Sequence, residues 1–257
     1  MLQMIAPRRL ISLQGVGKTY KNGATALAGV DLEVRDGEFL TLLGPSGCGK
    51  STILRLIAGL DSPSTGVLTR SFDDVGAALG FVFQEPTLMP WASVFDNVYL
   101  PLRLRGLSRQ SAGPAIMEAL GLVGLAASAK AFPRELSGGM RMRASIARAL
   151  VLRPLLLLMD EPFAALDEIA RFRLNDDLLR LQGAAGATIV FVTHSVYESA
   201  YLSTRILVMA GGPGRIVAEI ASEDRSPRDE NFRSSPAYAR ICAKASQALQ
   251  DAMQGDY

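Results

Sequence analysis

The chain has 257 residues, of which 49% are hydrophobic, and its 27 lysines and arginines nearly balance its 25 aspartates and glutamates. This length and apolar content favour a domain with a large buried core, while the net charge of +2 argues against nucleic acid or an anionic membrane as the main partner. The most apolar stretch, residues 155–159, is far shorter than the roughly 18 residues that a membrane-spanning helix needs.

Three apolar runs predict the strands of a core sheet. Residues 27–43 alternate apolar and polar positions and then become continuously apolar, which predicts an exposed strand followed by a buried parallel one. Residues 155–160 and 187–194 are two further short apolar runs, each ending in polar residues. Leucines at helical spacing lie between them, so strand and helix alternate and predict an α/β fold with a mostly parallel sheet and helices on both faces.

The strand pattern disappears from about Glu85 to Leu150. Within this stretch Ile116, Leu120 and Val123 mark one face of a helix, and SIARAL continues a second helix. We therefore expect a core domain over residues 8–221 with a helical subdomain inserted at about residues 85–150. A charged, turn-rich segment and a final helical pattern predict a C-terminal helical tail over residues 222–257.

The sequence GPSGCGKST follows the apolar run FLTLL and precedes the helical pattern ILRLIAGL. This is the strand–loop–helix context of a nucleotide phosphate-binding loop. Glycines let backbone N–H groups wrap the β- and γ-phosphates, a lysine adds a cation, and a serine hydroxyl can ligate Mg²⁺. The expected binding residues are Gly44, Pro45, Ser46, Gly47, Cys48, Gly49, Lys50, Ser51 and Thr52.

Both cysteines, Cys48 and Cys242, are expected to be reduced thiols, because a disulfide at Cys48 would obstruct the phosphate loop. That pattern favours a cytosolic protein. Since the Cys48 thiol would lie among phosphate-facing amides, we also expect it to react with a maleimide and to be protected by ATP.

Polar residues end the other predicted strands. Asp160 and Glu161 follow the run LLLLM; the first can hold Mg²⁺ through water and the second can act as general base toward the attacking water. A plain acidic helix cap is the alternative for this pair. Gln84 is a neutral amide that can coordinate Mg²⁺ or water, so the predicted metal ligands are Ser51, Gln84 and Asp160.

His194 is the only histidine and follows the third apolar run. A lone histidine is usually structural. At the sheet edge that faces the nucleotide in this fold class, however, its imidazole can bind the γ-phosphate and position the water, so we expect it to be catalytic with Glu161.

Taken together, these motifs resemble the nucleotide-binding subunit of an ATP-binding cassette (ABC) transporter over nearly the whole chain. Seven features occur in the family's order: Tyr20, the phosphate loop, Gln84, LSGGM at 136–140, LLLLMDEP, ALD at 165–167 and His194. The resemblance implies a P-loop NTPase core with N-terminal antiparallel strands, ATP and Mg²⁺ as cofactors, and stacking of Tyr20 on adenine.

The same resemblance implies that two copies of the chain close head to tail, so that LSGGM of one covers the ATP of the other. Ser137 and the amides of Gly138 and Gly139 would then present a helix N-terminus to the γ-phosphate, and Asp167 would sense the opposite site. Ser137 also suits an ordinary helix cap when ATP is absent. The nearby Arg141 and Arg143 are expected to form salt bridges within the helical subdomain.

Lacking a membrane span, the chain is expected to act on a separate permease at the cytoplasmic face of the inner (plasma) membrane. Four segments resemble the nitrate, sulfonate and taurine importer branch: QEPTLMPW, LSGGMR, DEPFAALD and PGRI. This resemblance implies permease subunits and, indirectly, a substrate-binding protein. An ABC system for lipid trafficking or export, or a non-transport ABC ATPase, is the alternative. Two residues depart from the family pattern: Met142 replaces a usual glutamine, and Ser195 a common aspartate.

Leu88, Met89 and Trp91 lie in the loop after Gln84. Their apolar side chains suit a groove for a permease helix, or else pack in the core, and the sequence leaves both readings open for Trp91.

Overall fold

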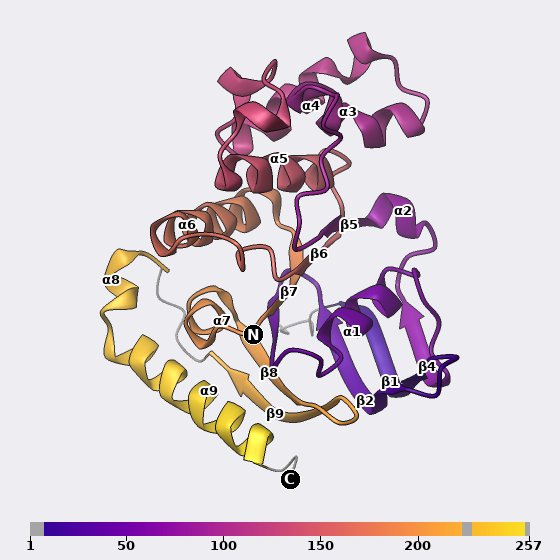
Figure 1. Cartoon of the computed structure of the whole chain (residues 1–257), viewed down its shortest axis with the longest axis vertical. Coiled ribbons are helices and arrows are strands. Elements are labelled where there is room, and N and C mark those ends of the chain that lie inside the picture. Colours follow the sequence, from indigo (N-terminus) through magenta and orange to yellow (C-terminus); the bar gives the residue numbers. More distant parts are fainter. Residues whose placement is uncertain (1–7, 223–227, 255–257) are drawn as a thin grey trace, which may run out of the picture. The chain divides into compact units, whose positions relative to one another are not determined.

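A computed structural model describes residues 8–222 and 228–254 (Figure 1). Contacts divide the chain into two compact units. The first combines the chain up to Val75 with the chain from Thr188 onward, and the second is Gly76–Ala187. Across the described residues, no helix combines the length and apolar character needed to cross a bilayer.

The first unit begins with an antiparallel sheet. Strand β1 (Arg9–Thr19) pairs with β2 (Thr25–Arg35) on one side and with β4 (Thr65–Arg70) on the other. Leu13, Val16 and Val30 are buried here, whereas β4 is largely exposed. These are the N-terminal antiparallel strands that the family resemblance implied.

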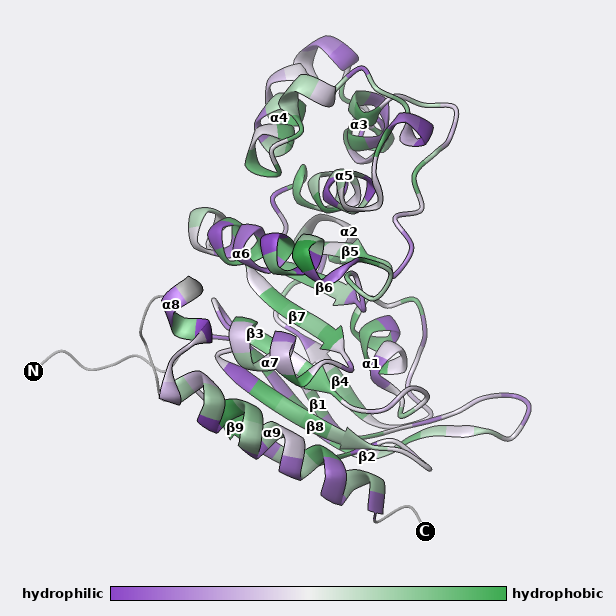
Figure 2. Cartoon of the chain, turned by 60° about the vertical axis from the view of Figure 1, so that its left-hand side comes forward, coloured by the Kyte–Doolittle hydropathy of each residue, from purple (hydrophilic) through white to green (hydrophobic). Residues whose placement is uncertain are grey.

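A second set of strands in the first unit is mostly parallel. Strand β3 (Phe39–Leu43) lies between β7 (Thr188–Thr193) and β8 (Arg205–Ala210), parallel to both, and β9 (Arg215–Ala221) is antiparallel to β8. Every residue of β3, β7 and β8 is buried, and Figure 2, which is coloured by hydropathy, shows β7 and β8 mostly green. Strands covered on both faces have this continuously apolar sequence, which is why the runs were recognisable.

Helices α1 (Lys50–Ile57) and α7 (Val196–Leu202) pack against β7, and α7 also against β3. After α8 (Glu230–Arg233), the long helix α9 (Pro236–Gln254) packs on β8, β9 and α7 (Figure 1). It buries Ile241, Ala245 and Ala252. The predicted tail thus contains a helix docked on the first unit; its residues 223–227 and 255–257 lie outside the described residues.

The second unit contains one parallel strand pair and a group of helices. Strand β5 (Leu79–Val82) pairs with β6 (Leu156–Asp160). A short helix α2 (Val75–Ala78) precedes them, and the remaining elements are α3 (Val94–Leu104), α4 (Arg109–Leu122), the short 3₁₀ turns Ala126–Ser128 and Pro133–Glu135, α5 (Gly138–Leu150) and α6 (Glu168–Ala185). Helix α3 packs on both α4 and α5.

The fold prediction is confirmed in its main features. The three apolar runs form β3, β6 and β7, and Leu174, Leu178 and Leu181 form the buried face of α6. The contact-based second unit is wider than the predicted insertion at residues 85–150, because it also includes β5, β6 and α6. The domain boundaries therefore stay a prediction.

Candidate functional site

The phosphate loop, Gly44–Thr52, connects the buried strand β3 to helix α1. Its lysine is held by its own loop: Lys50 is only 4% exposed, and its Nζ donates hydrogen bonds to the carbonyl oxygens of Gly44 at 2.8 Å and Pro45 at 2.7 Å. The loop therefore wraps around the ammonium group. A positive charge is already in place where phosphate oxygens would bind.

The glycines of this loop are required by its geometry. Gly49 has φ 94°, and a Cβ there would lie 2.6 Å from Leu27 Cδ2. A Cβ at Gly44 would lie 2.7 Å from Met209 O. Helix α1 begins after Gly49 without a side-chain cap, so its first N–H groups have no side-chain acceptor at the cap position, which suits a phosphate.

The expectation that the Cys48 thiol is reactive is wrong for this conformation. Cys48 is 1% exposed, and its Sγ lies inside the loop, 3.9 Å from Lys50 Nζ. Its backbone N–H donates within the loop, to Pro45 O at 3.4 Å. Neither Cys48 nor Cys242 forms a disulfide.

His194 is placed next to the phosphate loop by strand register. In the parallel pair β3–β7, Leu43 lies opposite Thr193, so the loop and His194 leave adjacent strands at the same level. The imidazole is exposed. Tyr20 also belongs to this region, because its hydroxyl oxygen lies 3.4 Å from Thr52 Oγ1 at the start of α1. The first unit therefore brings together the phosphate loop, His194 and Tyr20.

The residues on both sides of His194 in the chain form a hydrogen-bonded ring, which the sequence analysis missed. Glu198 is 5% exposed, and it accepts a hydrogen bond from Thr193 Oγ1 at 2.5 Å. Thr193 Oγ1 accepts from Ser195 N at 3.0 Å, and Ser195 Oγ accepts from Glu198 N at 3.3 Å. Because these bonds join Thr193, before the histidine, to Ser195 and Glu198, after it, they fix the turn that carries the imidazole.

In the second unit, strand register also groups the predicted residues. Val82 of β5 lies opposite Met159 of β6, so Gln84 and the pair Asp160–Glu161 follow neighbouring strands at the same end. Glu161 has φ 45°, a left-handed conformation that is uncommon for a residue other than glycine and is concentrated at functional sites. The structure thus holds the predicted general base in a strained turn directly after the strand.

The LSGGM segment, Leu136–Met140, leads into α5, and Ser137 caps this helix by accepting a hydrogen bond from Met140 N at 3.2 Å. The capping interpretation of Ser137 is confirmed. A Cβ on Gly139 would have no neighbour within 4 Å, whereas one on Gly138 would lie 3.5 Å from Leu166 Cδ2, so there is space beside Gly139 in the first turn of this helix. Asp167 is likewise the cap of α6, accepting from Ala170 N at 2.9 Å.

The arginines after LSGGM interact within the second unit. Arg143 forms a salt bridge, but with Asp177 of α6, which lies outside the predicted subdomain at residues 85–150, and Arg141 donates to the carbonyl of Leu136 at 2.8 Å; the prediction that both pair within that subdomain is wrong. Trp91, whose placement the sequence left open, is 77% exposed. Core packing of Trp91 is therefore wrong.

The predicted donors fit Mg²⁺ held together with a nucleotide. Among the described residues, no group of three or more His, Cys, Asp or Glu lies together. The predicted ligands Ser51, Gln84 and Asp160 supply a hydroxyl, an amide and one carboxylate. Mg²⁺ usually keeps several waters and binds through one or two carboxylates plus substrate phosphates, so this small oxygen set suits it.

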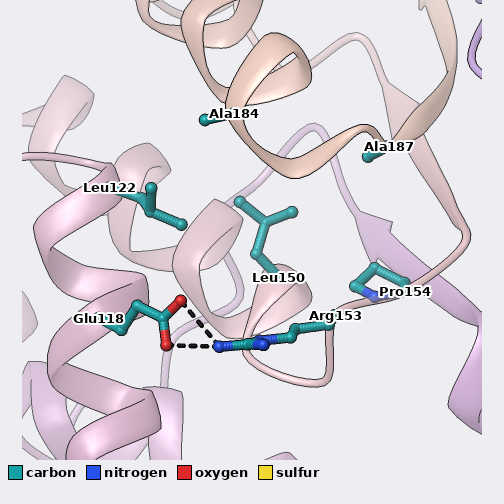
Figure 3. Close-up of a pocket in the computed structure, with 7 residues that line it drawn as sticks. All are labelled: Glu118, Leu122, Leu150, Arg153, Pro154, Ala184 and Ala187. Atoms are coloured by element: carbon teal, nitrogen blue, oxygen red, sulfur yellow. Dashed lines mark hydrogen bonds and ion pairs between the residues drawn. The ribbon is translucent and has the colours of Figure 1, made fainter.

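A cavity of about 230 Å³ lies in the second unit (Figure 3). Leu122 and Leu150 line it, and Arg153 Nη2 donates to both carboxylate oxygens of Glu118 at 2.8 and 2.7 Å. None of the predicted site residues lines it, so this cavity is separate from the nucleotide chemistry.

Comparison with known proteins agrees with these geometries. Residues 27–164 match the family model described as ABC transporter. The chain is 42% identical over 246 residues to the aliphatic sulfonates import ATP-binding protein SsuB 1 of Pseudomonas savastanoi pv. phaseolicola, covering 96% of this chain and 98% of that protein. It is 45% identical over 202 residues to the taurine import ATP-binding protein TauB of Rhizobium johnstonii, covering 77% of each.

Solved structures give the same result. A dimeric ATP-binding cassette in a post-hydrolysis state, bound to ADP and Pi, superposes with a TM-score of 0.72 at 34% identity, covering 82% of this chain and 98% of that chain. The protein cbiO1 of Clostridium perfringens, part of the cbiONQ transporter complex, has a TM-score of 0.76 at 27% identity, covering 82% and 88%.

Proposed function

Because the chain belongs to the ABC transporter family and is an ABC-type ATPase, we propose that it energises import of a small solute, such as a sulfonate, taurine or nitrate, through a separate permease. The phosphate loop supports the ATPase part, with Lys50 held between two loop carbonyls at the edge where His194 also emerges, and the similarity to sulfonate and taurine import ATP-binding proteins supports the import part. On this proposal the chain works at the cytoplasmic face of the inner membrane, attached through the permease.

In the proposed reaction, the loop amides and Lys50 bind the β- and γ-phosphates while Tyr20 stacks on the adenine. Ser51, Gln84 and Asp160 would hold Mg²⁺, which when bound neutralises charge on the phosphates. Glu161 accepts a proton from the attacking water, and His194 donates a hydrogen bond to the γ-phosphate and positions that water.

Two copies of the chain complete each site in this proposal. Ser137 and the amides of Gly138 and Gly139 bind the γ-phosphate held by the partner subunit, and Asp167 responds to the state of the opposite site. The two ATPs contribute contacts that only the closed dimer makes, and hydrolysis removes them, so the dimer opens. The exposed side chain of Trp91 is suited to contact a permease helix, which would transmit this motion.

The test is Glu161→Gln, which keeps the shape of the side chain but removes its basicity. This variant is expected to bind MgATP and to accumulate as a closed dimer, detected by light scattering after size exclusion. Glu168→Gln, on the exposed start of α6, serves as the matched control and should hydrolyse ATP like the unaltered chain. An E161Q chain that elutes as a monomer with saturating MgATP would contradict the proposal.

The transport assignment has its own test. Affinity purification of the tagged chain from detergent-solubilised native membranes is expected to recover a multi-span permease, and Trp91→Ala should recover less of it. Recovery of soluble partners alone would leave the ATPase in place and remove the assignment to transport.

A further inference from the structure

The loop between β5 and α3 is held in place by a side chain from far along the chain. We call residues 84–93 the Trp91 loop. Arg148, near the end of α5, donates from Nη1 to Thr87 O at 2.8 Å and from Nη2 to Pro86 O at 3.0 Å and Thr87 Oγ1 at 2.9 Å. Three hydrogen bonds from one planar guanidinium fix both the position and the direction of this backbone.

A second side chain holds the other end of the Trp91 loop. Asn97, in the first turns of α3 and fully buried, accepts from Met89 N at 2.7 Å. Its amide nitrogen lies within 3.0–3.2 Å of the carbonyl oxygens of Met89, Ala92 and Ser93. Since α3 packs on α5, both attachment points belong to one packed group of helices.

The backbone at the Arg148 attachment point is not in a relaxed conformation. Thr87 has φ 46°, a left-handed value that is strained for a β-branched residue and persists only when neighbours impose it. The three bonds from Arg148 end on this residue and the one before it. Partial burial lowers the pKa of the Arg148 guanidinium from its ordinary value, so the group is partly shielded from water where it makes these contacts. Pro86 and Pro90 restrict the backbone of this loop, and the bonds from Arg148 and Asn97 attach it to the helices.

From this geometry we propose that Arg148 is a positioning residue that makes α5 and the Trp91 loop move as one piece. The helix that begins at the LSGGM segment would then pass nucleotide-dependent movement to the surface around Trp91. The nucleotide-dependent part rests on the proposed function, in which LSGGM binds the ATP of the partner subunit. The attachment of the loop does not depend on that function.

The attachment is tested in the nucleotide-free chain by hydrogen exchange of the peptide covering residues 86–93. Arg148→Met keeps most of the side-chain length but removes the donors, and exchange at Met89 and Ala92 should become about tenfold faster. Arg148→Lys should lie between, because an ammonium cannot reproduce the fork. Arg153→Met, which removes an exposed arginine paired with Glu118, is the matched control and should leave this peptide unchanged. Unaltered exchange in R148M would overturn the proposal.

The coupling is tested with the fluorescence of Trp91, the only tryptophan in the chain. In the E161Q background, MgATP is expected to change the emission and acrylamide quenching of Trp91. The change should be lost in R148M/E161Q and kept in R153M/E161Q, while both still dimerise by light scattering. A response of unaltered size in R148M, or no response in E161Q despite a dimer, would overturn the coupling. Failure of E161Q itself to dimerise would instead refute the proposed function, and the exchange experiment would still decide the attachment.

Discussion

The phosphate loop and the Trp91 loop are both short connections leaving the end of a parallel strand, but they are held in different ways. Lys50 is bonded to carbonyls five and six residues away, so the first loop is organised by its own motif. Arg148 reaches the second loop across 61 residues of sequence. The conformation of the phosphate loop is determined by its own residues. The conformation of the Trp91 loop depends on the packing of the helices around it, so this loop is suited to follow a movement of those helices.

The largest effect that separates the two loops is expected for Lys50→Ala. It removes the cation from the phosphate loop, so kcat for ATP hydrolysis should fall by at least about 100-fold and ATP binding should weaken. The loss of two hydrogen bonds should lower the free energy of unfolding by only about 1–2 kcal/mol. Steady-state ATPase and nucleotide titration measure these effects, with Lys244→Ala on the exposed side of α9 as control. ATP binding within twofold of the unaltered chain would refute the role of Lys50.

Asn97→Ala, in the second unit, should lower the stability of the fold more than the ATPase rate, the reverse of Lys50→Ala. Removing this fully buried amide deprives the Met89 N–H and the Ala92 carbonyl of their side-chain partner and leaves a cavity, so the free energy of unfolding should fall by about 2–3 kcal/mol. Basal ATPase of the folded fraction should change little, because Asn97 bonds Met89, Ala92 and Ser93, at the other end of the loop from the predicted metal ligand Gln84. Denaturant unfolding checks this, with the exposed Asn231→Ala as control. A loss of stability below about 0.5 kcal/mol would show that the Trp91 loop does not need its bonds to Asn97.

The smallest effect is expected at the hydrogen-bonded ring beside His194. Like the phosphate loop, this ring is held by residues close in sequence. Glu198→Ala leaves the Thr193 hydroxyl without its acceptor and frees the turn, so kcat should fall about tenfold while ATP affinity stays within about twofold. Glu198→Gln should restore most of kcat, since its amide oxygen accepts the same hydrogen bond. An E198Q variant as slow as E198A, with an unchanged melting temperature, would mean that the carboxylate acts through its charge.

The parts predictable from sequence are those that short-range patterns determine. Buried parallel strands appear as continuous apolar runs, and the phosphate loop appears as glycines and Lys50 between such a run and a helix. The edge rule for parallel sheets then located His194, and the β3–β7 register agrees with it.

The parts that sequence could not supply depend on side-chain direction and on distant partners. Cys48 was expected to face the ligand, but its thiol points into the loop. Trp91 was left open between core and surface, because the loop that carries it is bonded to Arg148 and Asn97, partners that the residues beside Trp91 do not indicate. Glu198 has no motif of its own, and only the buried ring with Thr193 identifies it.

The head-to-tail sharing of sites between two chains is tested most directly by mixing two inactive variants. One is Lys50→Ala, and the other is Gly139→Asp, whose side chain fits the isolated chain because nothing lies within 4 Å of the added Cβ. The added charge would repel a phosphate at the α5 N-terminus. In a mixed dimer, one site combines the intact phosphate loop of one chain with the intact LSGGM segment of the other. Random mixing should therefore restore about a quarter of the unaltered ATPase rate. A mixture no more active than its separate components would contradict the account.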